Sequence, residues 1–186
     1  MRITMIKIFC LLLFPMLAAS LVAQAKDSLA TPVSIRAAVQ EFYDWYVPKA
    51  LSADISRAWE LTFKDRSSNF SPELSRLLKE DSDAQAKCSE LVGLDWDPIL
   101  SGQNPAEHYE VGNIRSEGAA AKGAEIYRAD VFRVESGEKS PKPDVTAEFV
   151  VDNESWYFVN FYYHRHGKGL LTILRLPLPK CSEPKP

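Results

Sequence analysis

The segment "VTAEFVVDNESWYFVNFYYH" (residues 145–164) contains two strand-like runs on either side of a short polar turn. In the first run, apolar residues occupy positions 145, 147, 149 and 151, which is the period of two expected for a strand with one buried face. The second run, from Trp156 to His164, is dominated by aromatic residues and predicts the last long strand. Together the runs predict an antiparallel hairpin whose turn is "DNES".

Upstream of this hairpin the sequence predicts two further strands, over residues 109–115 and 124–134, because the apolar period there is again two. The polar segment 135–144, with one Gly, two Pro and two Lys, is expected to be a turn or a mobile loop. The short apolar run at residues 170–176 fits either a final strand or a helix, since short apolar runs do not distinguish the two.

The N-terminal half follows a helical period instead. Ile35, Val39, Phe42 and Tyr46 recur at spacings of three and four, which predicts one helix with an aromatic stripe facing the core. Pro48 is expected to end this helix, because proline cannot continue the hydrogen-bond ladder.

A second strong helix start is "SPEL" (residues 71–74), where Ser supplies a cap and Pro occupies the first turn. This helix is expected to run to near Leu91 and to end at Gly93. Between the two helices, a weaker pattern over residues 51–63 allows a short helix. The stretch "GLDWDPILSGQNP" (residues 93–105) is expected to be an ordered loop, with its apolar side chains on the core.

Helices followed by a run of antiparallel strands predict the α+β class, with the N-terminal helices packed on an antiparallel sheet of about four strands. One hydrophobic core suits this length, so residues 26–180 are expected to form a single α+β domain and residues 181–186 a flexible tail.

The chain begins with the pattern of a secretory signal peptide. Arg2 and Lys7 precede an apolar run over residues 8–22, and Ala23-Gln24-Ala25 is a small-x-small cleavage site. The alternative is an uncleaved membrane anchor, which Pro15 and the cleavage motif disfavour. Residues 1–25 are therefore expected to be removed, leaving an exported, periplasmic or secreted protein without a membrane span.

Removal of residues 1–25 would also leave two of the three cysteines, Cys88 and Cys181. In an exported protein two remaining thiols usually pair, so we expect a disulfide that pins the C-terminal tail onto a helix end. The net charge would change from −3 to −5, because the removed segment carries two basic residues and no acidic one. A mildly acidic chain argues against nucleic acid as a partner.

Several short motifs carry a family resemblance. They are "FYDWYV" (42–47), "FSPELSRLL" (70–78), "LDWDPIL" followed by "GQ" (94–103), "WYFVNFYY" (156–163) and "LLTIL" (170–174). With these motifs the chain resembles a numbered bacterial domain-of-unknown-function family of small exported proteins, itself similar to the nuclear transport factor 2-like and cystatin-like α+β cone. The resemblance implies a curved sheet wrapped around the helices, with a cavity at the mouth of the cone. It implies no reaction, because proteins of this fold range from isomerases to binding domains.

The aromatic strand supplies the first set of candidate ligand-binding residues. On a regular strand one face would carry these five residues: Trp156, Phe158, Asn160, Tyr162 and His164. Rings with hydrogen-bonding tips are typical of a pocket wall, but also of ordinary core packing or of a dimer interface. The opposite face, with Tyr157, Val159, Phe161 and Tyr163, is expected to be the better core face.

Asp95 and Asp97, on either side of Trp96, complete the candidate ligand-binding set. Two such carboxylates suit acid–base chemistry or calcium binding, whereas an Asp before Pro also commonly caps a turn. His164 and His166 lie two positions apart, a spacing that can bind a metal, but neighbouring Arg165 and Lys168 disfavour a cation. No metal and no cofactor are therefore predicted.

Arg128 and Asp130 are predicted to lie on one solvent-facing side of a strand, as in a cross-strand ion pair. An isomerase-like alternative would make Asp130 a proton-transfer base and Tyr162 an oxyanion donor. The sequence contains no Gly-rich phosphate loop and no nucleophile elbow, so no catalytic residue is predicted.

The sequence thus favours an exported module that binds a small apolar or aromatic ligand or another envelope protein, without catalysis. Two alternatives stay open. One is an isomerase- or hydrolase-type enzyme that uses Asp130 or the His164/His166 end of the strand in an acidic cavity. The other is a dimeric envelope interaction or inhibitor module.

Overall fold

The structure is a computed structural model of the chain and describes residues 32–52, 57–120, 123–152, 155–164 and 167–182. The predicted signal peptide, the centre of the "DNES" turn, His166 and the last four residues lie outside the described residues. The described elements are, in chain order, α1 (Pro32–Ala50), η1 (Ala58–Glu60), α2 (Leu61–Asp65), η2 (Ser67–Asn69), α3 (Pro72–Lys87), β1 (His108–Ala119), β2 (Glu125–Glu135), β3 (Glu138–Lys139), β4 (Val145–Asp152), β5 (Ser155–Tyr163) and α4 (Leu170–Leu174).

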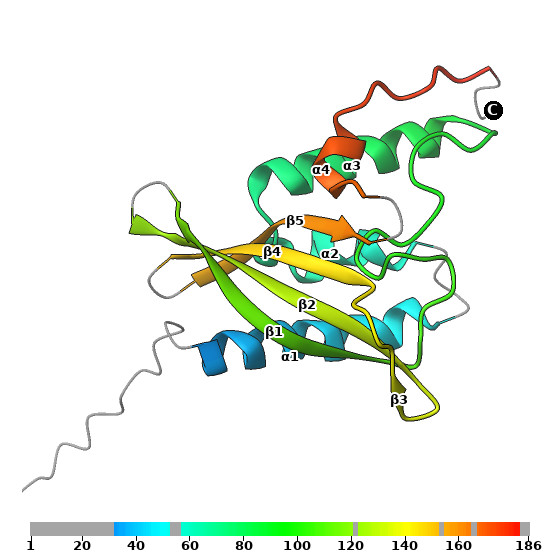
Figure 1. The fold of residues 1–186 in the computed structure, drawn as a ribbon. Helices are drawn as coiled ribbons and strands as arrows, with labels where there is room; N and C mark the ends of the chain where they lie inside the picture. Colours follow the sequence, from blue (N-terminus) through cyan, green and yellow to red (C-terminus); the bar gives the residue numbers. More distant parts are fainter. Residues whose placement is uncertain (1–31, 53–56, 121–122, 153–154, 165–166, 183–186) are drawn as a thin grey trace, which may run out of the picture.

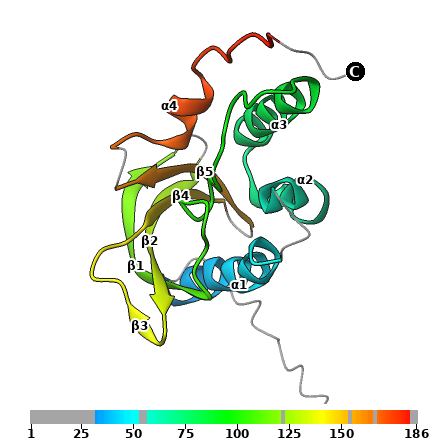
Figure 2. The same cartoon turned by 90° about the vertical axis from the view of Figure 1, so that its right-hand side faces the viewer.

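The strands form one antiparallel sheet in the order β1-β2-β4-β5, and the two-residue β3 pairs with β2 (Figure 1). The sheet is curved and does not close on itself, and α1, α2 and α3 lie together on one side of it (Figure 2). The predicted α+β class, with helices packed on a curved antiparallel sheet, is therefore confirmed. Among the described residues, no helix combines the length and the apolar character needed to cross a bilayer.

The core forms where α1 lies against the inner face of the sheet. The predicted stripe of α1 is buried, with Ile35, Val39, Phe42 and Tyr46 at most 1% exposed. The ring of Phe42 packs edge-on against Phe158 of β5, with 4.9 Å between the ring centroids. Burial of such side chains contributes about 1.5–3 kcal/mol each, so this contact is a major part of what holds the helix on the sheet.

Both outer strands of the sheet have partners along part of their free edges. The side-chain amide of Gln40 in α1 donates to the Tyr109 carbonyl at 2.9 Å and accepts from the Val111 amide at 2.8 Å. On the other side, the Ser71 amide donates to the Phe158 carbonyl at 2.8 Å. These bonds satisfy backbone groups that an edge strand would otherwise leave open to other chains.

The helix ends differ from the sequence prediction by a few residues. Helix α1 continues through Pro48 to Ala50, because proline in the last turn removes only one bond of the ladder. Helix α3 starts as predicted, with the Leu74 amide donating to the Ser71 hydroxyl at 3.2 Å, but it ends at Lys87 rather than near Leu91. Cys88 is extended (φ −111°, ψ 143°) and turns the chain away from the helix axis.

Two ambiguous segments are settled by the structure. The run after Gly169 is a short helix, α4, and not a strand. The polar segment 135–144 contains a tight turn at Ser136 and Gly137, both with positive φ, and this turn folds β3 back onto β2.

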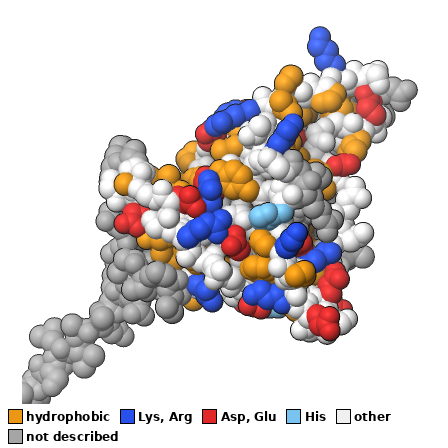
Figure 3. Space-filling view, in the orientation of Figure 1, with side chains coloured by type: hydrophobic (Ala, Val, Ile, Leu, Met, Phe, Trp, Pro, Cys, Tyr) orange, Lys and Arg blue, Asp and Glu red, His pale blue; other side chains and the backbone are white. Residues whose placement is uncertain are grey.

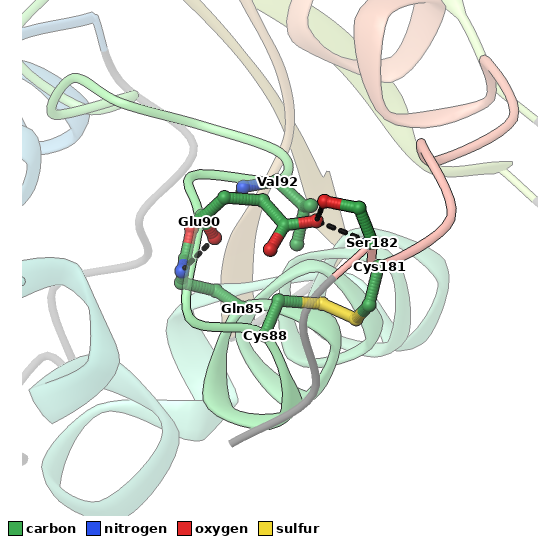
Figure 4. The surroundings of a disulfide bond; sticks show 6 residues. All are labelled: Gln85, Cys88, Glu90, Val92, Cys181 and Ser182. Atoms are coloured by element: carbon green, nitrogen blue, oxygen red, sulfur yellow. Dashed lines mark hydrogen bonds between the residues drawn. A yellow bond between two sulfur atoms is a disulfide. The ribbon is translucent and has the colours of Figure 1, made fainter.

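Cys88 and Cys181 form a disulfide, with 5.4 Å between their Cα atoms (Figure 4). Next to the disulfide, the Ser182 hydroxyl donates to the Glu90 carboxylate at 2.8 Å, and the Ser182 amide donates to the same oxygen. The tail is thus held at the end of α3, where the sequence predicted that it would be pinned.

Candidate functional site

A cavity of about 690 Å³ lies where the C-terminal ends of α1 and α3 meet η1 and the loop over residues 94–105. Its described lining from the helices and their ends is Ala50, Leu51, Ser52, Arg57, Ala58, Trp59 and Gln85. Its lining from the segment after α3 is Leu91, Leu94, Asp95, Trp96, Asp97, Gly102, Gln103 and Pro105. Apolar, aromatic and charged side chains therefore meet in one hollow, which is the usual composition of a small-molecule site.

The apolar part of this cavity includes exposed leucines. Among the described residues four large hydrophobic side chains are exposed, and two of them, Leu51 (45%) and Leu91 (61%), line the cavity. Trp96 is partly buried and packs edge-on against Tyr163, with 4.6 Å between the ring centroids. Because exposed apolar surface is costly in water, a ligand that covers these side chains would gain free energy from their burial.

Arg57 is the basic residue in the described lining, and its charge is balanced. Its guanidinium lies 3.1 Å from a carboxylate oxygen of Asp81 and 3.2 Å from one of Glu60. The same group lies over the ring of Trp59, 4.6 Å from the centroid. These contacts fix Arg57 as a structural element of the wall.

Asp97 joins the loop to α1. Its Oδ2 accepts from the Tyr46 hydroxyl at 2.5 Å, and its Oδ1 accepts from the amides of Ile99 and Leu100 at 2.8 and 3.0 Å. Enclosure of the carboxylate raises the pKa of Asp97 to about 6, although the three hydrogen bonds favour the ionised form and lower it. Of the interpretations considered for this residue, turn capping is the one that the contacts show directly.

The loop also depends on Asp81, which the sequence analysis did not single out. Its side chain is almost fully buried, pairs with Arg57 and accepts from the Leu94 amide at 3.0 Å. Burial raises the pKa of Asp81, and the bonds from Leu94 and Arg57 oppose that change. A Cβ at Gly93, where φ is +93°, would lie 2.2 Å from the Asp81 carboxylate. Only glycine therefore fits at this position. The sequence did contain a signal that Asp81 is buried, because its position continues the helical spacing of the apolar residues Leu74, Leu77 and Leu78.

The five candidate residues of the aromatic strand do not share one face of the sheet, so the predicted alternation of faces is wrong. In the register of β4 and β5, Glu148 pairs with Asn160 and Phe149 pairs with Phe158, which leaves Val159 as an extra residue. Such a β-bulge reverses the alternation of faces along the strand. Trp156 and Phe158 consequently point into the core, whereas Asn160 and Tyr162 lie on the other side of the sheet.

Asn160 has a structural role on that outer side. Its Oδ1 accepts from the amides of Phe161 and Leu171, both at 3.0 Å, and so ties α4 to the strand. A Cβ on Gly169 would lie 2.8 Å from the Asn160 amide nitrogen, which shows how closely the chain approaches.

Tyr162 belongs to a charged network on the outer face. Its hydroxyl donates to Glu148 at 3.2 Å, and its ring lies under the Arg128 guanidinium, 4.5 Å from the centroid. Arg128 in turn pairs with Glu148 at 2.8 Å. These contacts give Tyr162 ordinary cross-strand partners, outside the core.

His164 and Asp130 lie on the same outer face, linked through Thr146. The Thr146 hydroxyl donates to Asp130 at 2.9 Å and lies 3.2 Å from Nε2 of the exposed His164. Asp130 also pairs with Arg115 at 3.0 Å, so its ion partner comes from β1 and not from Arg128. This face is charged and mixed, with basic, acidic and hydrophobic side chains interspersed (Figure 3).

The predicted residues therefore divide into three places: Asp95 and Asp97 on the cavity, Trp156 and Phe158 in the core, and the remaining three outside the sheet. The isomerase-like arrangement needs Asp130 and Tyr162 inside a cavity, whereas both lie on the outer face. Within the described part of the chain, no group of three or more His, Cys, Asp or Glu residues is placed to hold a metal ion.

Fold and site together define an α+β protein with a mixed apolar and acidic cavity at the ends of its helices. No family model, no curated protein and no solved structure matches the chain. The site must therefore be interpreted from its own residues.

Proposed function

We propose that the protein is an exported, non-catalytic binding module that takes up a small ligand with an apolar body in the cavity between the helix ends and the loop 94–105. The observation that carries this proposal is the pair of exposed leucines, Leu51 and Leu91, on the wall of a cavity of about 690 Å³. A soluble protein rarely leaves large apolar side chains exposed around a hollow unless something covers them.

Export is supported by two independent features of the chain. Residues 1–25 have the composition of a signal peptide, although they lie outside the described residues. The Cys88–Cys181 disulfide fits an oxidising compartment such as the periplasm or the extracellular space. We also propose that the protein is related to the exported α+β cone proteins that its short motifs resemble.

A binding role is favoured over catalysis by how two charged groups of the cavity, Asp97 and Arg57, are used. Both oxygens of Asp97 accept hydrogen bonds from the protein, and the guanidinium of Arg57 is engaged by two carboxylates. General acid–base catalysis needs a group within hydrogen-bond reach of the substrate proton. Groups held in this way are better suited to shaping a pocket.

Direct binding of a neutral, apolar fluorescent probe, N-phenyl-1-naphthylamine, tests the proposal. We expect saturable binding of one probe per chain, with about a tenfold loss of affinity in Leu91→Glu, because a charge replaces the apolar wall. Leu176→Glu is the matched control, since Leu176 is also exposed (56%) but does not line the cavity. Absence of saturable binding, or equal losses in both variants, would contradict the proposal.

A further inference from the structure

The charges of the described residues that line the cavity do not cancel. Arg57 lies between Asp81 and Glu60 and is neutralised by them, at 3.1 and 3.2 Å. Asp95 and Asp97 also line the cavity, and neither forms an ion pair with a basic residue in the parts of the chain that the structure describes. At neutral pH the cavity therefore has a negative potential, which attracts cations and repels anions.

The side chain of Asp95 is free to meet a ligand. The residue is exposed, and its backbone carbonyl, not its carboxylate, accepts the bond from the Gln103 side chain at 2.9 Å. Asp97, two positions further on, holds the loop in place through Tyr46 and the loop amides. One carboxylate thus positions the wall and the other is available at its surface.

Trp96 lies between these two aspartates in the chain and lines the same cavity. A Trp ring attracts a cation placed over its face, within about 6 Å of the centroid. Two other Trp rings of this chain already do so, since Lys49 lies 4.5 Å from the centroid of Trp45 and Arg57 lies 4.6 Å from that of Trp59. Organic ammonium groups bind over aromatic faces, and a carboxylate close to the ring adds electrostatic attraction.

We infer that the ligand is an amphipathic organic cation, an aliphatic amine or quaternary ammonium compound. Its charged group lies beside Asp95 and Trp96, and its apolar chain covers Leu51 and Leu91. This inference rests on the proposed function and adds the chemical class of the ligand. It follows from the cavity as a whole, because the apolar wall and the unbalanced negative charge occur on one surface.

Calorimetric titration with three probes of equal chain length tests the inference: octylamine, octan-1-ol and octanoate. At pH 7.5 and low salt we expect octylamine to bind about tenfold more tightly than octan-1-ol and octanoate to bind more weakly than both. Asp95→Asn is expected to remove most of this preference, so that octylamine and octan-1-ol bind with similar affinities. Glu110→Gln is the matched control, because it removes the same charge from the outer side of the sheet, where Glu110 pairs with Lys139.

The outcomes separate the two proposals. Equal affinities for octylamine and octan-1-ol, a preference for octanoate, or a preference that persists in Asp95→Asn would overturn the cationic ligand and leave the binding module standing. If none of the three probes binds, both proposals are wrong.

Discussion

The sheet and the segment over residues 88–105 are held in place by different means. In the sheet, backbone hydrogen bonds and buried side chains such as Phe149 and Phe158 supply the stability, and charged groups stay on the outer face. In the segment 88–105 there is no helix or long strand. Its course is fixed by a disulfide and by two carboxylates, Asp81 and Asp97, that accept backbone amides.

This difference shows that an aspartate has a different role in each region. On the sheet, Asp130 pairs with Arg115 and Thr146 on the outer face, where its side chain is 19% exposed and water screens part of its charge. In the segment, Asp81 supplies an acceptor that water cannot replace, because the Leu94 amide and the Asp81 carboxylate are both buried. The cavity wall formed by this segment is therefore built from polar contacts, and its shape should respond to single substitutions more than the sheet's outer face does.

The largest effect is expected inside the sheet. Phe158→Ala should lower the free energy of unfolding by about 3–5 kcal/mol, because the ring is fully buried between α1 and β4. Tyr162→Ala, four residues along the same strand but on the outer face, should cost only about 1 kcal/mol for its contacts with Arg128 and Glu148. Urea unfolding measures both values. Similar losses in the two variants would show that the bulge at Val159 does not separate the faces.

A smaller loss is expected from the segment 88–105. Asp81→Ala should lower the free energy of unfolding by about 2–4 kcal/mol, because it leaves the buried Leu94 amide without an acceptor and removes a partner of Arg57. Asp130→Ala, the matched change on the sheet, should cost no more than about 1 kcal/mol. A larger loss of stability in Asp130→Ala than in Asp81→Ala would contradict this prediction.

The smallest effect concerns the pH dependence of stability. The pKa of Asp97 is about 6 in the folded state and near 3.8 when unfolded, so the folded protein binds the proton more tightly. Stability should therefore rise as the pH falls through 6. Integration of the linkage relation gives a gain of roughly 1 kcal/mol between pH 7 and pH 5. Asp97→Asn should lack this gain, as measured by denaturant unfolding at several pH values.

Other groups do not obscure that measurement. Asp97 interacts electrostatically with Tyr43 and Tyr46 of α1 and with Tyr163 of β5, and burial raises the pKa values of these tyrosines well above 10. The pKa of Asp81 is also raised, but it contributes to the wild type and to Asp97→Asn alike. If the free energy of unfolding changed with pH in the same way in the wild type and in Asp97→Asn, the titration of Asp97 would not contribute to stability.

Much of the fold was predictable, because long periodic patterns report directly on burial. The α1 stripe and the alternation of Val145, Ala147 and Phe149 located the core faces of a helix and a strand. The bulge at Val159 was not predictable, since nothing in "WYFVNFYY" distinguishes an extra residue from a regular strand. One unpaired residue was enough to separate Trp156 and Phe158 from Tyr162.

The candidate site was only partly predictable for a related reason. Asp95 and Asp97 lie in a loop that Pro and Gly mark clearly, so they could be singled out. Leu91 was expected at the end of a helix, because the disulfide-linked end of α3 at Cys88 leaves no local signal in the helical period. Arg57 and Trp59 reach the cavity only through the packing of distant segments, which no local pattern encodes.

A crystal structure of the protein purified from its native host would test the central claim most directly. We expect electron density for a bound compound in the cavity between the ends of α1 and α3 and the loop 94–105, in contact with Trp96 and Leu91. A cavity filled by the protein's own side chains, or a compound bound on the outer face of the sheet beside Tyr162 and His164 instead, would contradict it.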